Sequence, residues 1–179
     1  MTHKMSSLVR IVLILHLTTE IHSRFEFTNV KFTSLDKKFG EVDYCYLKSV
    51  NRTYKYLSMK FKLYQLPVNN LKLNLVLMKR FNGYKPFLYN ITVNACKFFA
   101  NPKSSPVANF FYESFVTFSN LNHSCPYNHD IIVDKVPVEF INHRFTQILQ
   151  FPEGDYLFDA YWSSSGSPFA VVKIYGTLS

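Results

Sequence analysis

The clearest pattern in the chain is an alternation of apolar and polar side chains along two neighbouring stretches, residues 57–63 and 71–78. The apolar positions are Leu57, Met59, Phe61 and Leu63 in the first stretch and Leu71, Leu73, Leu75 and Leu77 in the second. A period of two is typical of a strand with one buried face, whereas a helix would need spacings of three and four. Because only a short turn at residues 67–70 separates the stretches, we expect an antiparallel hairpin.

A third alternation begins at Phe87. Apolar side chains occupy one side and polar side chains the other: Phe87, Tyr89, Ile91, Val93 and Ala95 against Asn90, Thr92 and Asn94. The pattern predicts a strand over residues 87–96 with one wet face.

Shorter apolar stretches predict the other strands, at residues 25–34, 42–47, 131–133, 136–138, 156–162 and 169–175. Pro137 favours an edge position for its strand, because proline cannot donate to a ladder. The pair Ser105-Pro106 indicates a helix start, and a helix over residues 106–118 would gather five apolar side chains on one side. About eight antiparallel strands and one short helix predict an all-β, immunoglobulin-like sandwich.

The first residues have the features of a signal peptide. Lys4 and Arg10 give a positive start, an apolar run follows at residues 11–17, and Ser23 offers a small residue for cleavage. We therefore expect a signal peptide at residues 1–23, a single mature domain at residues 24–179, and a secreted, extracellular protein. No run of 18 apolar residues is present, so no transmembrane segment is expected.

The formal net charge of the 179 residues is +8. The basic residues are scattered singly, which favours a solvated basic face over a nucleic-acid site; contact with anionic lipid headgroups is the alternative. Asn51, Asn90 and Asn122 each begin a glycosylation sequon.

Three cysteines, Cys45, Cys96 and Cys125, leave one unpaired in a secreted chain. We expect a Cys96–Cys125 disulfide, which would stabilise the fold by about 3–4 kcal/mol on the chain-entropy model. The rival pairings use Cys45, which is otherwise a buried free thiol or the site of an intermolecular disulfide.

The apolar faces of these strands give the sandwich an apolar interior, which is a filled core if the sheets close and a lipid cavity if they splay. The candidate cavity residues are Leu57, Met59, Phe61, Leu63, Leu73, Leu75, Leu77, Phe87, Tyr89, Ile91, Val93, Phe110 and Phe111. Such a site binds by burying apolar surface and needs no cofactor.

Signals of catalysis are weak. His123, His129, Asp130 and Asp134 lie close in sequence, but their spacing matches no zinc pattern, and we expect them to be loop and cap residues. The chain contains no Gly-x-Ser-x-Gly, His-Glu-x-x-His or Cys-x-x-Cys motif. We therefore expect neither an enzyme nor a metal site.

Several phrases of the sequence resemble a secreted insect family that is catalogued as a domain of unknown function, DUF1091. They are Phe27-Thr28-Asn29-Val30-Lys31, Asp43-Tyr44-Cys45, Lys85-Pro86-Phe87-Leu88-Tyr89-Asn90, Ala95-Cys96-Lys97-Phe98, Asn122-His123-Ser124-Cys125-Pro126-Tyr127 and Pro152-Glu153-Gly154-Asp155-Tyr156. That family is similar to the MD-2-related lipid-recognition (ML-like) fold and includes chemosensory proteins that resemble the ganglioside activator. The resemblance implies a sandwich that holds a lipid or hydrocarbon between its sheets.

One position departs from the family pattern. Members usually carry a cysteine after the Val-Lys pair of the first strand, where this chain has Phe32. The resemblance implies that this cysteine pairs with the one at the position of Cys45, so its loss explains the odd cysteine count.

These observations lead us to expect a secreted, non-enzymatic carrier for a hydrophobic small molecule or lipid. The alternative is a secreted interaction module with a filled core, which would bind an extracellular receptor through its loops.

Overall fold

The computed structural model describes residues 23–52 and 54–179. Of the expected signal peptide at residues 1–23, all but Ser23 lies outside the described residues. No helix among the described residues is long and apolar enough to cross a membrane.

In the described part of the chain, eight strands form two antiparallel sheets, which confirms the predicted all-β sandwich. The strands are β1 (Phe25–Ser34), β2 (Gly40–Ser49), β3 (Lys55–Leu63), β4 (Lys72–Phe81), β5 (Gly83–Asn94), β6 (Ile131–Pro137), β7 (Gly154–Ser164) and β8 (Ser167–Leu178). The larger sheet has the order β1-β8-β7-β4-β5 and the smaller one β2-β3-β6. Strand β6, which ends at Pro137, lies at an edge as expected.

The hairpin predicted between residues 57–63 and 71–78 is wrong. Strand β3 pairs with β2 and β6 in the smaller sheet, whereas β4 pairs with β5 and β7 in the larger sheet. Residues 64–71 therefore carry the chain from one sheet to the other. The alternation is the same in either arrangement, because two strands with one apolar face each can lie side by side or face each other across a core.

The segment between β5 and β6 is more helical than the sequence indicated. It contains α2 (Ala95–Ala100), α3 (Pro106–Tyr112) and two 3₁₀ turns, Pro102–Ser104 and Val116–Phe118. The predicted 106–118 helix thus ends at Tyr112. The predicted 87–96 strand ends at Asn94, because the Asn94 side chain accepts a hydrogen bond from the Lys97 amide at 3.0 Å and caps α2.

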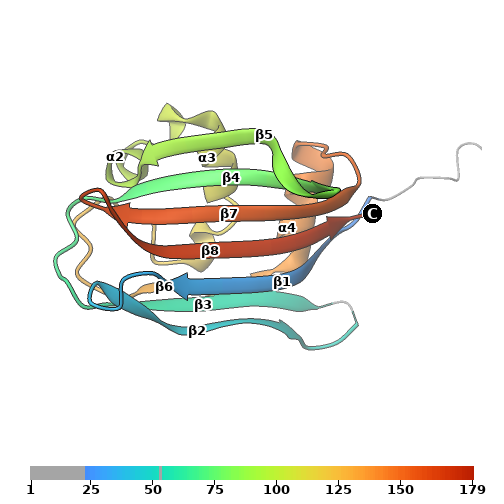
Figure 1. The fold of residues 1–179 in the computed structure, drawn as a ribbon. Helices are drawn as coiled ribbons and strands as arrows, with labels where there is room; N and C mark the ends of the chain where they lie inside the picture. Colours follow the sequence, from blue (N-terminus) through green and yellow to red (C-terminus); the bar gives the residue numbers. More distant parts are fainter. Residues whose placement is uncertain (1–22, 53) are drawn as a thin grey trace, which may run out of the picture.

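Two further elements join β6 to β7: α4 (Val138–His143) and a π-helical turn, Arg144–Ile148. Val138, which was expected to belong to a strand, begins α4 instead. In Figure 1, α3 and α4 lie behind the five-stranded sheet, on the face of that sheet that is turned to the interior, and β3 and β2 continue beyond its β1 edge. The buried side chains form two hydrophobic clusters in this interior.

Candidate functional site: a cavity between the sheets

A cavity of about 200 Å³ lies between the sheets. Four of its lining side chains, Phe32, Ile91, Phe115 and Trp162, pack against both hydrophobic clusters. The cavity therefore lies at the junction of the two clusters, and these four side chains are half-buried.

Two walls of the cavity come from the inner faces of the sheets. The larger sheet contributes Phe25, Phe27, Phe32, Leu73, Leu75, Ile91, Val93, Phe158, Ala160, Trp162, Phe169, Ala170, Val172 and Ile174; the smaller sheet contributes Leu57, Met59, Phe61, Leu63, Ile131, Val133 and Val136. Strand alternation, shifted by irregularities in the pairing of β1 with β8, β3 with β6 and β7 with β8, places most of these side chains on the inner face of each strand.

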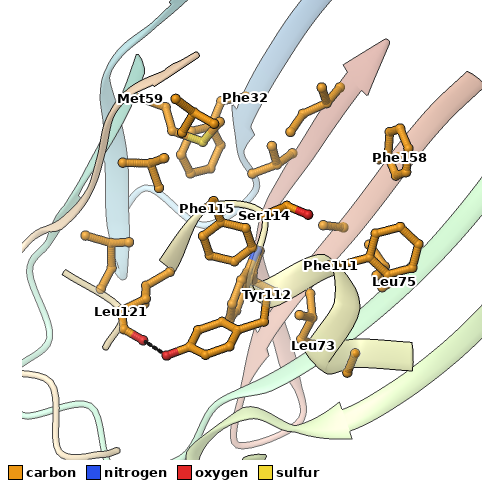
Figure 2. A pocket seen from close by; sticks show the side chains of 18 of the residues that line it. Phe32, Met59, Leu73, Leu75, Phe111, Tyr112, Ser114, Phe115, Leu121 and Phe158 are labelled. Carbon is orange, nitrogen blue, oxygen red and sulfur yellow. Dashed lines mark hydrogen bonds between the residues drawn. The ribbon is translucent and has the colours of Figure 1, made fainter. Parts of the chain in front are cut away.

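The third wall is the segment between Cys96 and Cys125. The predicted disulfide between these residues is present, with a Cα–Cα distance of 5.1 Å. Eight residues of this disulfide-closed segment line the cavity: Phe98, Phe99, Ala108, Phe111, Tyr112, Ser114, Phe115 and Leu121. Figure 2 shows Phe111, Tyr112, Ser114 and Phe115 reaching in from this segment toward Leu73 and Leu75 of β4 and Met59 of β3.

Arg144 attaches this third wall to the segment after α4. Its Nε donates to Ser114 Oγ at 3.0 Å, and its terminal nitrogen donates to the Phe110 carbonyl at 2.7 Å and to Glu113 Oε2 at 3.0 Å. The guanidinium also lies 4.8 Å from the centre of the Phe110 ring. Because Arg144 is buried, these partners are what compensates the loss of its hydration.

Tyr127 anchors the other end of the wall, next to Cys125. Its side chain is fully buried, and its backbone exchanges hydrogen bonds with Val68 at 2.9 and 3.0 Å. Its hydroxyl donates to the His123 carbonyl, and burial raises the pKa of that hydroxyl.

Two hydroxyl groups belong to residues that line the cavity, and both are already engaged. The Tyr112 hydroxyl donates to the Leu121 carbonyl at 2.8 Å, a bond drawn in Figure 2. Ser114 Oγ donates to the Phe110 carbonyl at 3.2 Å while it accepts from Arg144. No residue that lines the cavity in the described chain is charged.

The structure brings nine of the thirteen predicted site residues together around the cavity: Leu57, Met59, Phe61, Leu63, Leu73, Leu75, Ile91, Val93 and Phe111. The other four lie outside its lining. Leu77 is fully buried in the core, and Phe87, Tyr89 and Phe110 pack against the same cluster. All four belong to the apolar core beside the cavity rather than to its wall.

Several lining residues were missed. Phe25, Phe27 and Phe32 belong to a strand that was predicted, and they could have been included on that ground. Trp162 ends a largely apolar run, and no local pattern in that run tells which of its side chains face the interior. Ile141 and Phe145 come from helical turns that were not predicted.

The histidine and aspartate residues of the 120–134 region make local contacts. His123 and His129 face each other with 2.9 Å between their Nε2 atoms, and the Asn120 amide lies 3.0 Å from His129 Nδ1. Asp130 accepts from the Leu63 amide, and Asp134 accepts from the Ser58 hydroxyl. The described residues contain no group of three or more His, Cys, Asp or Glu side chains that could hold a metal ion.

Cys45 is a half-buried free thiol. Burial raises the pKa of this thiol to about 11, although a hydrogen bond with the Phe32 backbone opposes the shift. The thiol is thus within hydrogen-bonding reach of the very strand position where the resemblance places a partner cysteine.

The sequon residues Asn51, Asn90 and Asn122 are all exposed. Thr53, the third residue of the first sequon, lies outside the described residues. Each asparagine is thus in a position that could carry a glycan without disturbing the core.

A search of curated proteins finds no match to this chain. A family model described as "Protein of unknown function (DUF1091)" matches residues 73–158. This region runs from β4 into β7 and contains the whole disulfide-closed segment, so it supplies much of the cavity lining. The match covers just under half of the chain and agrees with the resemblance that the sequence motifs carry.

Proposed function

We propose that this protein is a secreted, non-catalytic carrier that holds a lipid or hydrocarbon in the cavity between its sheets. A chemosensory role, which the resemblance implies, is part of this proposal. The observation that carries it is the cavity of about 200 Å³, which has only uncharged residues around it. Natural cores are close-packed and contain few voids larger than a water molecule, so an apolar space of this size is a place for apolar cargo.

The energetics favour such cargo. Each methylene group that moves from water into apolar surroundings contributes about 0.8 kcal/mol. The two lining hydroxyl groups already donate hydrogen bonds within the protein. A hydrocarbon chain can therefore cover them without leaving an unsatisfied donor.

The disulfide supports the extracellular location in this proposal. Disulfides persist in oxidising compartments and are rare in the cytosol. The Cys96–Cys125 bridge also closes the segment that forms the third wall of the cavity. In an oxidising compartment the bond persists, and it holds this wall in place.

The proposal is tested by mass spectrometry of an organic extract from the natively secreted protein, together with displacement of a fluorescent apolar probe, N-phenyl-1-naphthylamine. We expect a co-purifying lipid or hydrocarbon and saturable probe uptake. A protein that is empty and takes up no probe would contradict the proposal and favour the interaction module.

A matched pair of variants locates the binding. Ala160 lies in the cavity wall and Ala100 is exposed at the end of α2. Ala160→Leu fills part of the space and should weaken probe uptake several-fold, whereas Ala100→Leu should leave uptake unchanged. Equal uptake by both variants would place the bound probe elsewhere.

A further inference from the structure

Trp162 brings a hydrogen-bond donor to the cavity lining. It lies on β7 opposite Leu73 of β4, which also lines the cavity, and it is the single tryptophan of the chain. Its indole N–H can only donate. In the described part of the chain, no protein atom accepts a hydrogen bond from it, in contrast to the engaged hydroxyl groups of Tyr112 and Ser114.

The indole nitrogen is also not sealed inside protein. Among the described residues, the fully buried side-chain polar atom that lacks a partner is Asp159 Oδ1. Trp162 Nε1 therefore keeps some accessible surface, on a half-buried side chain that lines the cavity. Its natural partner is an acceptor atom on whatever enters.

The kind of acceptor follows from the other groups around the space. A carboxylate is disfavoured, because no lining residue in the described chain is charged and an uncompensated buried charge is costly. An alcohol brings a donor of its own and needs a second partner. A ketone, aldehyde or ester oxygen accepts without donating and matches the free N–H alone.

We propose that the ligand is a long-chain neutral carbonyl compound whose oxygen accepts a hydrogen bond from Trp162. This inference rests on the proposed function and goes beyond it by naming the ligand class. A pure hydrocarbon covers the indole N–H and leaves it unpartnered, whereas the carbonyl compound satisfies it. Trp162 is thus the group that selects among apolar ligands.

The test compares 2-undecanone with undecane in the full mature protein and in Trp162→Phe, by displacement of N-phenyl-1-naphthylamine. Within one protein, the ratio of the ketone affinity to the alkane affinity also reflects the different water solubilities of the two compounds. This contribution cancels when the ratio in Trp162→Phe is compared with the ratio in the wild type. We expect the ketone-to-alkane affinity ratio to fall about tenfold in Trp162→Phe. Alkane affinity should not fall.

Tyr161→Phe is the control, because Tyr161 is the neighbouring aromatic residue on β7, is exposed and does not line the cavity. It should keep the wild-type ratio. In the wild type, the emission of Trp162 should move to longer wavelength with the ketone and to shorter wavelength with the alkane.

An unchanged ratio in Trp162→Phe, with both probes still bound, would overturn the carbonyl proposal and leave the carrier function in place. Failure of the wild type to bind either probe would overturn both.

Discussion

The cavity has two kinds of wall, and they are held in different ways. In the sheet wall, β4 is paired with β5 on one side and β7 on the other over most of its length. The disulfide-closed segment, residues 96–125, has one isolated bridge to a strand, Ser119 to Val133, and otherwise depends on a few attachments. These include the disulfide, the hydrogen bonds of Arg144, the hydrogen bonds of Asn120 to Asp130 and Ile132, and the anchor at Tyr127.

The difference teaches which part of the site can change without loss of the fold. A paired strand shares its stability with its neighbours, so damage to its core side unfolds the domain. A wall with few attachments can loosen locally while the sheets persist. The following predictions test this distinction, from the largest expected effect to the smallest.

Leu77→Ala and Leu73→Ala make the same change on the same strand. Leu77 is fully buried in close-packed core, so its truncation should lower the free energy of unfolding by about 3–5 kcal/mol. Leu73 faces the cavity and is only half-buried, and its truncation should cost about 1–2 kcal/mol. Urea unfolding measures both values. Equal losses would mean that the space beside Leu73 is packed.

Replacing Cys96 and Cys125 together by alanine should lower the free energy of unfolding by about 3–4 kcal/mol, because the bond closes a loop over a sequence separation of 29 residues. Native-state hydrogen exchange should accelerate first in residues 97–124, ahead of β4 and β7. Uniform acceleration over the whole domain would show that the two walls open as one unit.

Phe32→Cys should restore the bridge that the family resemblance implies. The Cys45 thiol already lies at the Phe32 backbone, and both side chains face the core. Under oxidation we expect peptide mapping to show a disulfide between the introduced cysteine and Cys45. The oxidised variant should be about 3 kcal/mol more stable than the same variant after selective reduction. Persistent free thiols in oxidised protein would refute the expected pairing.

The Cys45 thiol gives the smallest effect, at alkaline pH. Its pKa is about 11 in the folded chain against an ordinary value of 9.0, so between these values the unfolded chain has bound fewer protons than the folded one. The contribution of this thiol to stability is therefore complete below pH 9 and decreases as the pH rises toward 11. Cys45→Ala should lose less stability than the wild type over this interval. Identical pH profiles by thermal unfolding would contradict the assignment.

The sequence predicted much of this architecture because the relevant signals are local. Alternation identified the inner faces of β3, β4 and β5, and the spacing of Cys96 and Cys125 indicated the disulfide. These features depend on strand geometry and on the reach of a short segment. For the same reason, nine of the predicted site residues do line the cavity.

Other features depend on contacts between distant parts of the chain. The turn at residues 64–71 could form a hairpin or cross between sheets, and only the pairing of β3 with β6 and of β4 with β7 distinguishes the two. Arg144 bonds to Ser114 over a separation of 30 residues, and neither residue belongs to a recognisable motif.

The sequence by itself determined that strands with one apolar face would enclose an apolar interior, and that Cys96 and Cys125 would close one side of it. The tertiary structure decided that this interior keeps an open space and that Trp162, whose N–H has no acceptor among the described residues, belongs to its lining. The physical reason is that the distance between two sheets is set by all the side chains that meet across it. No local pattern along the chain encodes the combined size of those side chains.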